Sequence, residues 1–116
     1  MTAKKFDTGK PDMTLVPMAL KEAVAKVMGF GCAKYGRDNW KAGEGLDWHR
    51  PMAAAMRHLD KHNEGMLIDE ESGMPHIWHA ATNIAFLCHY MKLGMGGMVR
   101  KTESILGDEN ESEEQS

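Results

Sequence analysis

The sequence has few cysteines, no long apolar run and no surplus of basic charge. Its two cysteines, Cys32 and Cys88, are not in a CxxC pair, and both fall in apolar helical patterns. We therefore expect free, buried thiols in a reducing compartment. No apolar segment is long enough to span a membrane, and the first residues lack the apolar core of a signal peptide. Together these absences favour a cytoplasmic protein without a membrane partner.

The formal net charge of the 116 residues is −3, which gives no electrostatic footprint for duplex nucleic acid. Residues 107–116 carry five acids and no base, so the remaining chain has a net charge of +2. We expect residues 1–106 to form a single helical domain and residues 107–116 a disordered acidic tail. Because so short a chain buries a limited core, we also expect a homo-oligomer.

Strand-like alternation is missing from the chain, and three segments show helical periodicity instead. The first begins at Pro17 and ends near Gly36, the second covers residues 51–63, and the third covers residues 75–93. Residues 98–106 add a possible short amphipathic helix. The sequence thus predicts an all-α protein, a small helical bundle of about three main helices plus short helical pieces.

Two features of the first segment have alternative interpretations. Gly29 and Gly31 indicate either a bend in the helix or close packing of another helix. The following KYGRDNW stretch, residues 34–40, mixes cations with Tyr35 and Trp40. It suits either the stacking of a base and the neutralisation of phosphates, or a helix terminus with a tryptophan that plugs the core.

Isolated polar residues elsewhere also have two interpretations. Lys10, in the polar arm before the first helix, is either a solvated charge or a lysine that reaches a phosphate. His58 and His62 lie one turn apart on the same face of the second helix. Such a pair either presents two metal ligands or is a feature of the helix surface.

The richest stretch is DEESGMPHIWHAATN, residues 69–83, in which three carboxylates lead into the third helix. Ser72 is a plausible N-cap of that helix. His76, His79 and Asn83 share one face, which becomes apolar further along, and the opposite face is apolar as well. A helix that is apolar on two sides is central in a bundle or lies at a subunit interface.

These residues suggest one pocket with a divalent metal, Mg²⁺ or Mn²⁺ with Zn²⁺ possible, which neutralises phosphate charge and activates water for phosphoanhydride hydrolysis. The alternative is that the histidines only satisfy a buried helix end. In the hydrolytic interpretation the metal ligands are Asp69, Glu71, His76 and His79. His58, as ligand or general base, and Glu71 are the catalytic candidates. The substrate-binding candidates are Lys10, Lys34, Tyr35, Trp40, Arg57 and Asn83.

Four ordered motifs resemble the phage family of the dATP/dGTP diphosphohydrolase N-terminal domain. They are KFDTGKPDMTLVP (5–17), FGCAKYGRDNW (30–40), MRHL (56–59) and EGMLIDEESGMPHIWHAATNIAFL (64–87). The resemblance implies an all-α protein like the MazG-type nucleotide pyrophosphohydrolases. It also implies metal-dependent conversion of a purine deoxynucleoside triphosphate to the monophosphate and pyrophosphate. The positions that match the family pattern are Asp7, Gly9, Lys10, Lys34, Tyr35, Trp40, Arg57, His58, Asp69, Glu71, Ser72, Gly73, His76, His79 and Asn83.

MazG-type enzymes bind Mg²⁺ through Glu-x-x-Glu and Glu-x-x-Asp pairs, whereas this chain has His76-x-x-His79 on the corresponding kind of helix. Two other functions therefore stay open from the sequence. One is a non-catalytic nucleotide-binding protein that sequesters its ligand. The other is a small helical interaction protein, which the two apolar sides of the third helix would suit.

Overall fold

The computed structural model describes residues 3–98, and within them it confirms the all-α prediction. Three long helices, α1 (Met18–Tyr35), α2 (His49–Asn63) and α3 (His76–Leu93), are joined by loops with the 3₁₀ turns η1 (Met13–Leu15) and η2 (Asn39–Lys41). The only strand-like feature in residues 3–98 is an isolated bridge between Ile68 and Pro75. The predicted acidic tail, residues 107–116, and the predicted short helix at residues 98–106 lie outside the described residues, except for Met98.

The helix boundaries follow the prolines and glycines of the sequence closely. α1 and α3 begin directly after Pro17 and Pro75, and α1 ends directly before its C-cap Gly36, as expected. α2 begins two residues before Pro51, which is tolerated in the first turn because the N–H that proline lacks would have no helical partner there. The prediction that Ser72 caps α3 is wrong, since Pro75 occupies the N-cap and the Ser72 side chain bonds elsewhere.

α3 is the central helix, because it packs against both α1 and α2. Its buried face runs from His76 and His79 through Ala80 to Leu87 and Tyr90. The opposite face is largely open in the single chain, where Ile77 and Ile84 remain exposed. Cys88 lies on that open face, so the prediction of buried thiols is wrong; both cysteines are free and exposed. Apolar spacing along a helix marks faces that suit burial, but the surfaces that carry the two cysteines remain exposed in residues 3–98.

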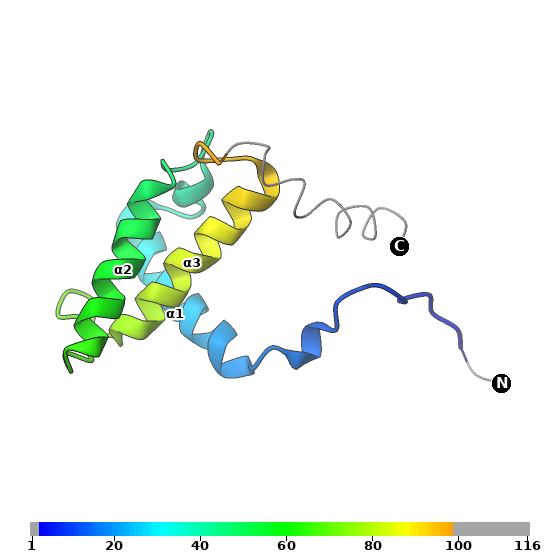
Figure 1. Cartoon of the computed structure of the whole chain (residues 1–116), viewed down its shortest axis with the longest axis horizontal. Coiled ribbons are helices and arrows are strands. Elements are labelled where there is room, and N and C mark those ends of the chain that lie inside the picture. Colours follow the sequence, from blue (N-terminus) through cyan, green and yellow to red (C-terminus); the bar gives the residue numbers. More distant parts are fainter. Residues whose placement is uncertain (1–2, 99–116) are drawn as a thin grey trace.

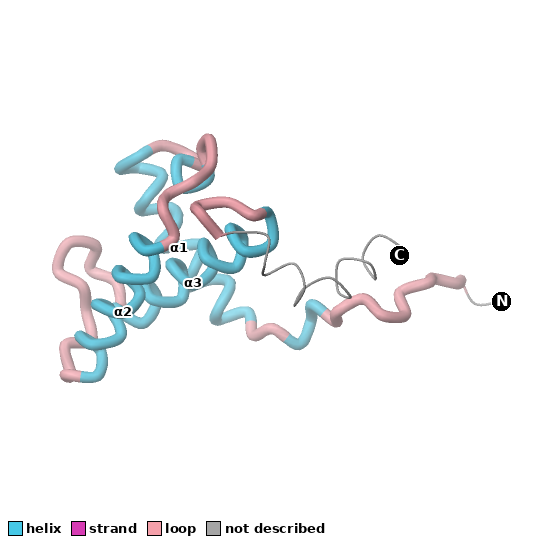
Figure 2. Tube along the Cα trace, turned by 45° about the horizontal axis from the view of Figure 1, so that its top comes forward, coloured by secondary structure: helices cyan, strands magenta, loops and turns pink. Residues whose placement is uncertain are grey.

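The loops gather at the two ends of the bundle (Figures 1 and 2). One end holds the acidic loop, residues 64–75, between α2 and α3. The other end holds the Gly-rich loop, residues 36–48, together with residues 94–98. The arm formed by residues 3–12 runs away from the bundle (Figure 1). None of the helices in residues 3–98 is both long and apolar enough to cross a membrane.

Tyr90 ties the Gly-rich loop to the C-terminal end of α3. Its side chain is fully buried, and its hydroxyl donates to the Trp40 carbonyl and accepts from the Leu46 N–H at 3.1 Å. Gly45 and Gly96 lie against the ring: a Cβ on Gly45 would be 2.7 Å from the ring, and a Cβ on Gly96 would be 2.9 Å from it. Glycine is therefore required at both positions for the loop to close over the ring, and this packing sets the place of Trp40.

Candidate functional site

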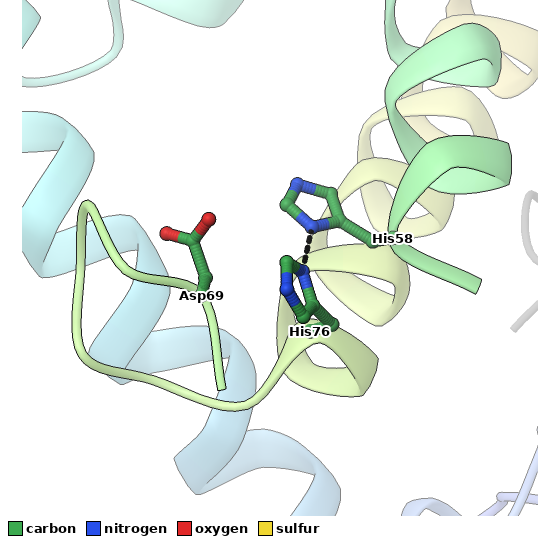
Figure 3. Close-up of side chains that lie close together, drawn as sticks. All are labelled: His58, Asp69 and His76. Atoms are coloured by element: carbon green, nitrogen blue, oxygen red, sulfur yellow. Dashed lines mark hydrogen bonds between the residues drawn. The ribbon is translucent and has the colours of Figure 1, made fainter. Parts of the chain in front are cut away.

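A cluster of imidazoles and a carboxylate forms where α2, α3 and the acidic loop meet. Figure 3 shows His58 on α2 facing His76 at the start of α3, with the Asp69 carboxylate across a gap from them. The Nδ1 atoms of the two histidines are 2.8 Å apart. One potential ligand atom from each of the three residues lies within 4.8 Å of the others. His58 also stacks on His79, with ring centroids 4.6 Å apart. We call His58, Asp69, His76 and His79 the histidine cluster.

Ser72 connects two members of this cluster. Its Oγ lies 2.8 Å from Asp69 Oδ2, 2.6 Å from His79 Nε2 and 3.1 Å from the Met74 N–H. A hydroxyl has one proton and two lone pairs. All three contacts are satisfied if Ser72 donates to Asp69 and accepts from Met74 and from a protonated His79 Nε2. We assign the His79 tautomer on this basis.

The surroundings shift the pKa values of His58, His79 and Asp69. Partial burial lowers the pKa of His58 and of His79 below the ordinary value of 6.5, and the neighbouring imidazoles lower both further. Partial burial raises the pKa of Asp69, but the hydrogen bonds from Ser72 and the nearby histidines lower it more, so the net shift is downward. At neutral pH the Asp69 carboxylate therefore lies beside the neutral rings of His58 and His79.

The cluster borders a cleft of about 890 Å³ that extends along α1 toward Trp40. That volume falls in the range of small-molecule sites, which is roughly 300–1,000 Å³. His58, Asp69 and His79 line one end, and Phe86 and Trp40 line the other. Charged and amide side chains also border the cleft: Lys34, Arg37, Arg50, Glu71 and Asn83.

Glu71 and Lys34 form an ion pair across the acidic loop and the end of α1. This hydrogen bond raises the pKa of Lys34, which is therefore fully charged at neutral pH. The pair joins two predicted site residues, but it directs the Glu71 carboxylate to the lysine. Glu71 is not in the group of potential ligand atoms formed by His58, Asp69 and His76.

The two aromatic candidates differ in how far a ligand could reach them. The Trp40 ring stacks on Phe86 at 4.5 Å, its edge meets His89, and the Lys41 ammonium lies over it at 5.6 Å. These contacts favour the interpretation of Trp40 as a core plug that forms a wall of the cleft. Tyr35 is 63% exposed and also lines the cleft, with the Lys34 ammonium 5.1 Å from its ring centroid, so it is the more accessible of the two rings.

The remaining predicted residues lie further from the cluster. Lys10 is exposed in the N-terminal arm and does not line the cleft. Arg57 lines a neighbouring hollow of about 440 Å³, which shares Arg50 and Asn83 with the main cleft. Asn83 donates to the His79 carbonyl at 2.9 Å. His62, the other half of the predicted histidine pair, is exposed on α2.

Sequence reasoning missed two contributors to the site. Ser72 was predicted as a cap and as a position that matches the family pattern, but its bridge between Asp69 and His79 was not predicted. Arg50 lies in the first turn of α2 and lines the cleft beside Leu46, and no sequence motif marks it. A three-residue Asp-to-Ser spacing, typical of a side-chain-bonded turn, is the signal that points to Ser72.

Comparison with known proteins agrees with the motif pattern of the sequence. The sequence profile of the family described as "dATP/dGTP diphosphohydrolase, N-terminal" matches residues 1–100. The chain belongs to this family. The diphosphohydrolase N-terminal family thus covers all the residues of the histidine cluster and of the cleft. No solved structure matches the chain.

A relative of this diphosphohydrolase N-terminal chain is a protein of Salmonella phage PMBT28 named dATP/dGTP diphosphohydrolase. The two are 40% identical over 90 residues, which cover 75% of this chain and 29% of the phage protein. The chain therefore spans less than a third of the length of that relative.

Proposed function

We propose that this chain is a metal-dependent hydrolase of purine (deoxy)nucleoside triphosphates, which yields the monophosphate and pyrophosphate. The observation that carries the proposal is the cleft in which the histidine cluster, a charged lysine and an open aromatic ring line the same space. The name of the phage relative supports the same substrate class. We expect the reaction to take place in the host cytoplasm.

Each part of the cleft suits one part of such a substrate. The exposed Tyr35 ring offers a stacking surface for a base. Arg37 and Arg50 line the same cleft and offer charge to the phosphates. A phosphate would also compete with Glu71 for Lys34, since the ammonium is paired with that carboxylate. Binding would then free the Glu71 carboxylate to accept a proton from water.

The chemistry of the reaction needs positive charge on the phosphates and a base for water. A divalent ion held by the histidine cluster would supply the charge. His58 is part of the cluster, and its lowered pKa keeps it neutral and able to accept a proton at neutral pH. Glu71 and His58 are our two candidates for the base. His58 can take that role only if it does not bind the metal through Nδ1, because its Nε2 would then carry the ring proton.

The test is to incubate the protein with each common nucleoside triphosphate and with Mg²⁺, Mn²⁺ or Zn²⁺, and to separate the products by chromatography. We expect purine monophosphate with wild-type protein and with His62→Ala, and a loss of at least about 100-fold in rate with His58→Ala, as for removal of a general base. A folded, metal-loaded wild-type protein that releases no monophosphate from any nucleotide would refute the proposal.

A second candidate is a nucleotide-binding module without catalysis. The observation that favours it is the length of the phage relative, of which this chain spans only 29%, so that the named activity could reside in the rest of that protein. Nucleotide binding that persists after chelation of metals, with no turnover, would support this second candidate over the first.

A further inference from the structure

We propose that His58, His76 and Asp69 form a binding site for a first-row transition-metal ion, of the Zn²⁺ or Mn²⁺ class, in preference to Mg²⁺. The inference deepens the proposed function, since it names the metal class and the ligands of the same site. Its catalytic meaning rests on that function, but the binding itself can be tested without any nucleotide.

The three side chains converge from separate parts of the fold. His58 comes from α2, His76 from the first turn of α3, and Asp69 from the loop between those helices (Figure 3). Their potential ligand atoms lie within 4.8 Å of one another. Because the loop begins and ends on the two helices that supply the histidines, the packing of α2 on α3 sets the spacing of all three ligands.

The histidine spacing is close to what a metal needs. Two nitrogens bound to one tetrahedral ion at about 2.0–2.1 Å are about 3.3 Å apart. The two Nδ1 atoms are now 2.8 Å apart, at the distance of a hydrogen bond between the rings. An opening of about half an ångström, within the reach of a small rotation of either ring, would convert this contact into a chelate.

Asp69 has one oxygen fixed and one free. Oδ2 accepts from the backbone N–H of Ser72 at 2.9 Å and from its hydroxyl at 2.8 Å. Oδ1 has no hydrogen-bond partner within residues 3–98. Oriented carboxylates of this kind are typical around metal centres, where hydrogen bonds from neighbouring groups fix the ligand in place. Oδ1 is therefore the oxygen that we assign to the metal.

His79 and Glu71 are excluded from the ligand set by the partners they already have. The Nε2 proton of His79 is directed to Ser72, and its ring stacks on His58 at a centroid distance of 4.6 Å. His79 is thus a positioning residue, which holds the His58 ring and, through Ser72, the carboxylate. Glu71 is bonded to Lys34.

The donor set decides the class of metal. Mg²⁺ prefers oxygen ligands and water in octahedral geometry, whereas imidazole nitrogens suit Zn²⁺, Fe²⁺, Co²⁺ and, with carboxylates, Mn²⁺. Two of the three proposed ligand atoms are imidazole nitrogens, and the third is a carboxylate oxygen. The same three ligands leave coordination positions open toward the cleft side of Asp69, which a catalytic site requires.

The experiment titrates the metal-stripped full-length protein with Co²⁺ in visible absorption, and with Zn²⁺ and Mg²⁺ in calorimetry. We expect one Co²⁺ per chain with d–d bands, displacement by Zn²⁺, and no displacement by excess Mg²⁺. His58→Ala, His76→Ala and Asp69→Asn should each weaken binding by at least about 100-fold. Glu71→Gln and the surface control His62→Ala should bind as the wild type does. Circular dichroism and urea unfolding verify that each variant is folded.

Should His76→Ala fail to fold, Asp69→Asn decides the question, because it keeps the side chain volume and changes only the donor. Unchanged Co²⁺ binding in folded Asp69→Asn and His58→Ala would overturn the inference and leave an imidazole–imidazole hydrogen bond as the only role of the pair. Hydrolysis that runs on Mg²⁺ in a protein without a Co²⁺ site would also overturn it, while the proposed function stands. A Co²⁺ site in a protein that hydrolyses no nucleotide would uphold the inference and refute the proposed function.

Discussion

The two ends of α3 bury different kinds of side chain. At its N-terminal end the buried groups are the imidazoles of His76 and His79, which contact His58 and Ser72. At its C-terminal end the buried Tyr90 bonds the loop backbone and fills the space between two glycines. The difference indicates a division of roles along one helix, with reactive groups at one end and the packing that orders the cleft wall at the other.

We expect the largest effect on stability from Gly96→Ala, at the C-terminal end of α3. Gly96 has a φ of 65°, and a Cβ there would lie 2.5 Å from the Leu46 carbonyl oxygen and 2.9 Å from Tyr90. We expect a loss of about 3 kcal/mol in the free energy of unfolding, from overpacking and left-handed strain together. Urea unfolding measures it. The matched control is Gly43→Ala, which has a φ of 60° in open space and should lose only about 1 kcal/mol. Equal losses in both variants would show that the packing on Tyr90 contributes nothing.

A smaller effect is expected from Tyr90→Phe. The change removes the hydroxyl that bridges the Trp40 carbonyl and the Leu46 N–H, which leaves both without that partner. We expect a loss of about 2 kcal/mol in stability, with the metal affinity of the histidine cluster unchanged. Tyr35→Phe, on an exposed ring, should leave stability within about 0.5 kcal/mol of the wild type. A large loss of Co²⁺ binding in Tyr90→Phe would contradict the division between the two ends.

Gly31→Ala should separate stability from ligand binding. A Cβ at Gly31 would meet no atom within 4 Å, and the residue lines the cleft. We expect the helix to gain about 1 kcal/mol in stability, while nucleotide affinity falls about tenfold because the added methyl group takes space in the cleft. Ala33 lies in the same turn of α1 outside the cleft, so Ala33→Gly should lose stability and leave affinity unchanged. Thermal unfolding and calorimetric nucleotide titration measure the two quantities.

The smallest expected effect is a pH dependence of stability, which arises from the histidines at the N-terminal end of α3. The folded-state pKa values of His58 and His79 are lowered from 6.5, chiefly by burial, so the unfolded chain binds more protons just below that pH. Stability is therefore full above about pH 6.5 and falls as the pH drops through the window down to the folded-state values. Urea unfolding at about pH 7.5 and about pH 5.5 measures the fall. Replacement of both His58 and His79 by alanine should remove the fall in stability, whereas His62→Ala should keep it.

The fold was predictable from the sequence because its determinants are local. Pro17, Gly36 and Pro75 mark helix ends through their own backbone preferences, and the structure follows them to within a residue. Gly29 and Gly31 show where local reasoning fails. Of the two interpretations, close packing of another helix is not found in residues 3–98, where a Cβ on either glycine would meet no atom within 4 Å. The glycines border the cleft, and a helical pattern contains no information about a cleft.

The site was predictable in part, for the same reason. Helical spacing placed His76 and His79 on one buried face, and the predicted partner His58 contacts both of them across the α2–α3 contact. The pairing of Glu71 with Lys34 depends on how the acidic loop lies against α1, which no spacing rule describes. The burial of Trp40 depends on Phe86 and Tyr90, which follow it by about fifty residues.

The central claim is that the histidine cluster serves nucleotide hydrolysis, and phosphorus NMR of dATP and dGTP incubated with metal-loaded protein tests it most directly. We expect equal amounts of monophosphate and pyrophosphate with the wild type and with Gly43→Ala, and neither product at a comparable rate with folded His76→Ala. Formation of both products by His76→Ala at the wild-type rate, or of no product by the folded wild type, would contradict the account.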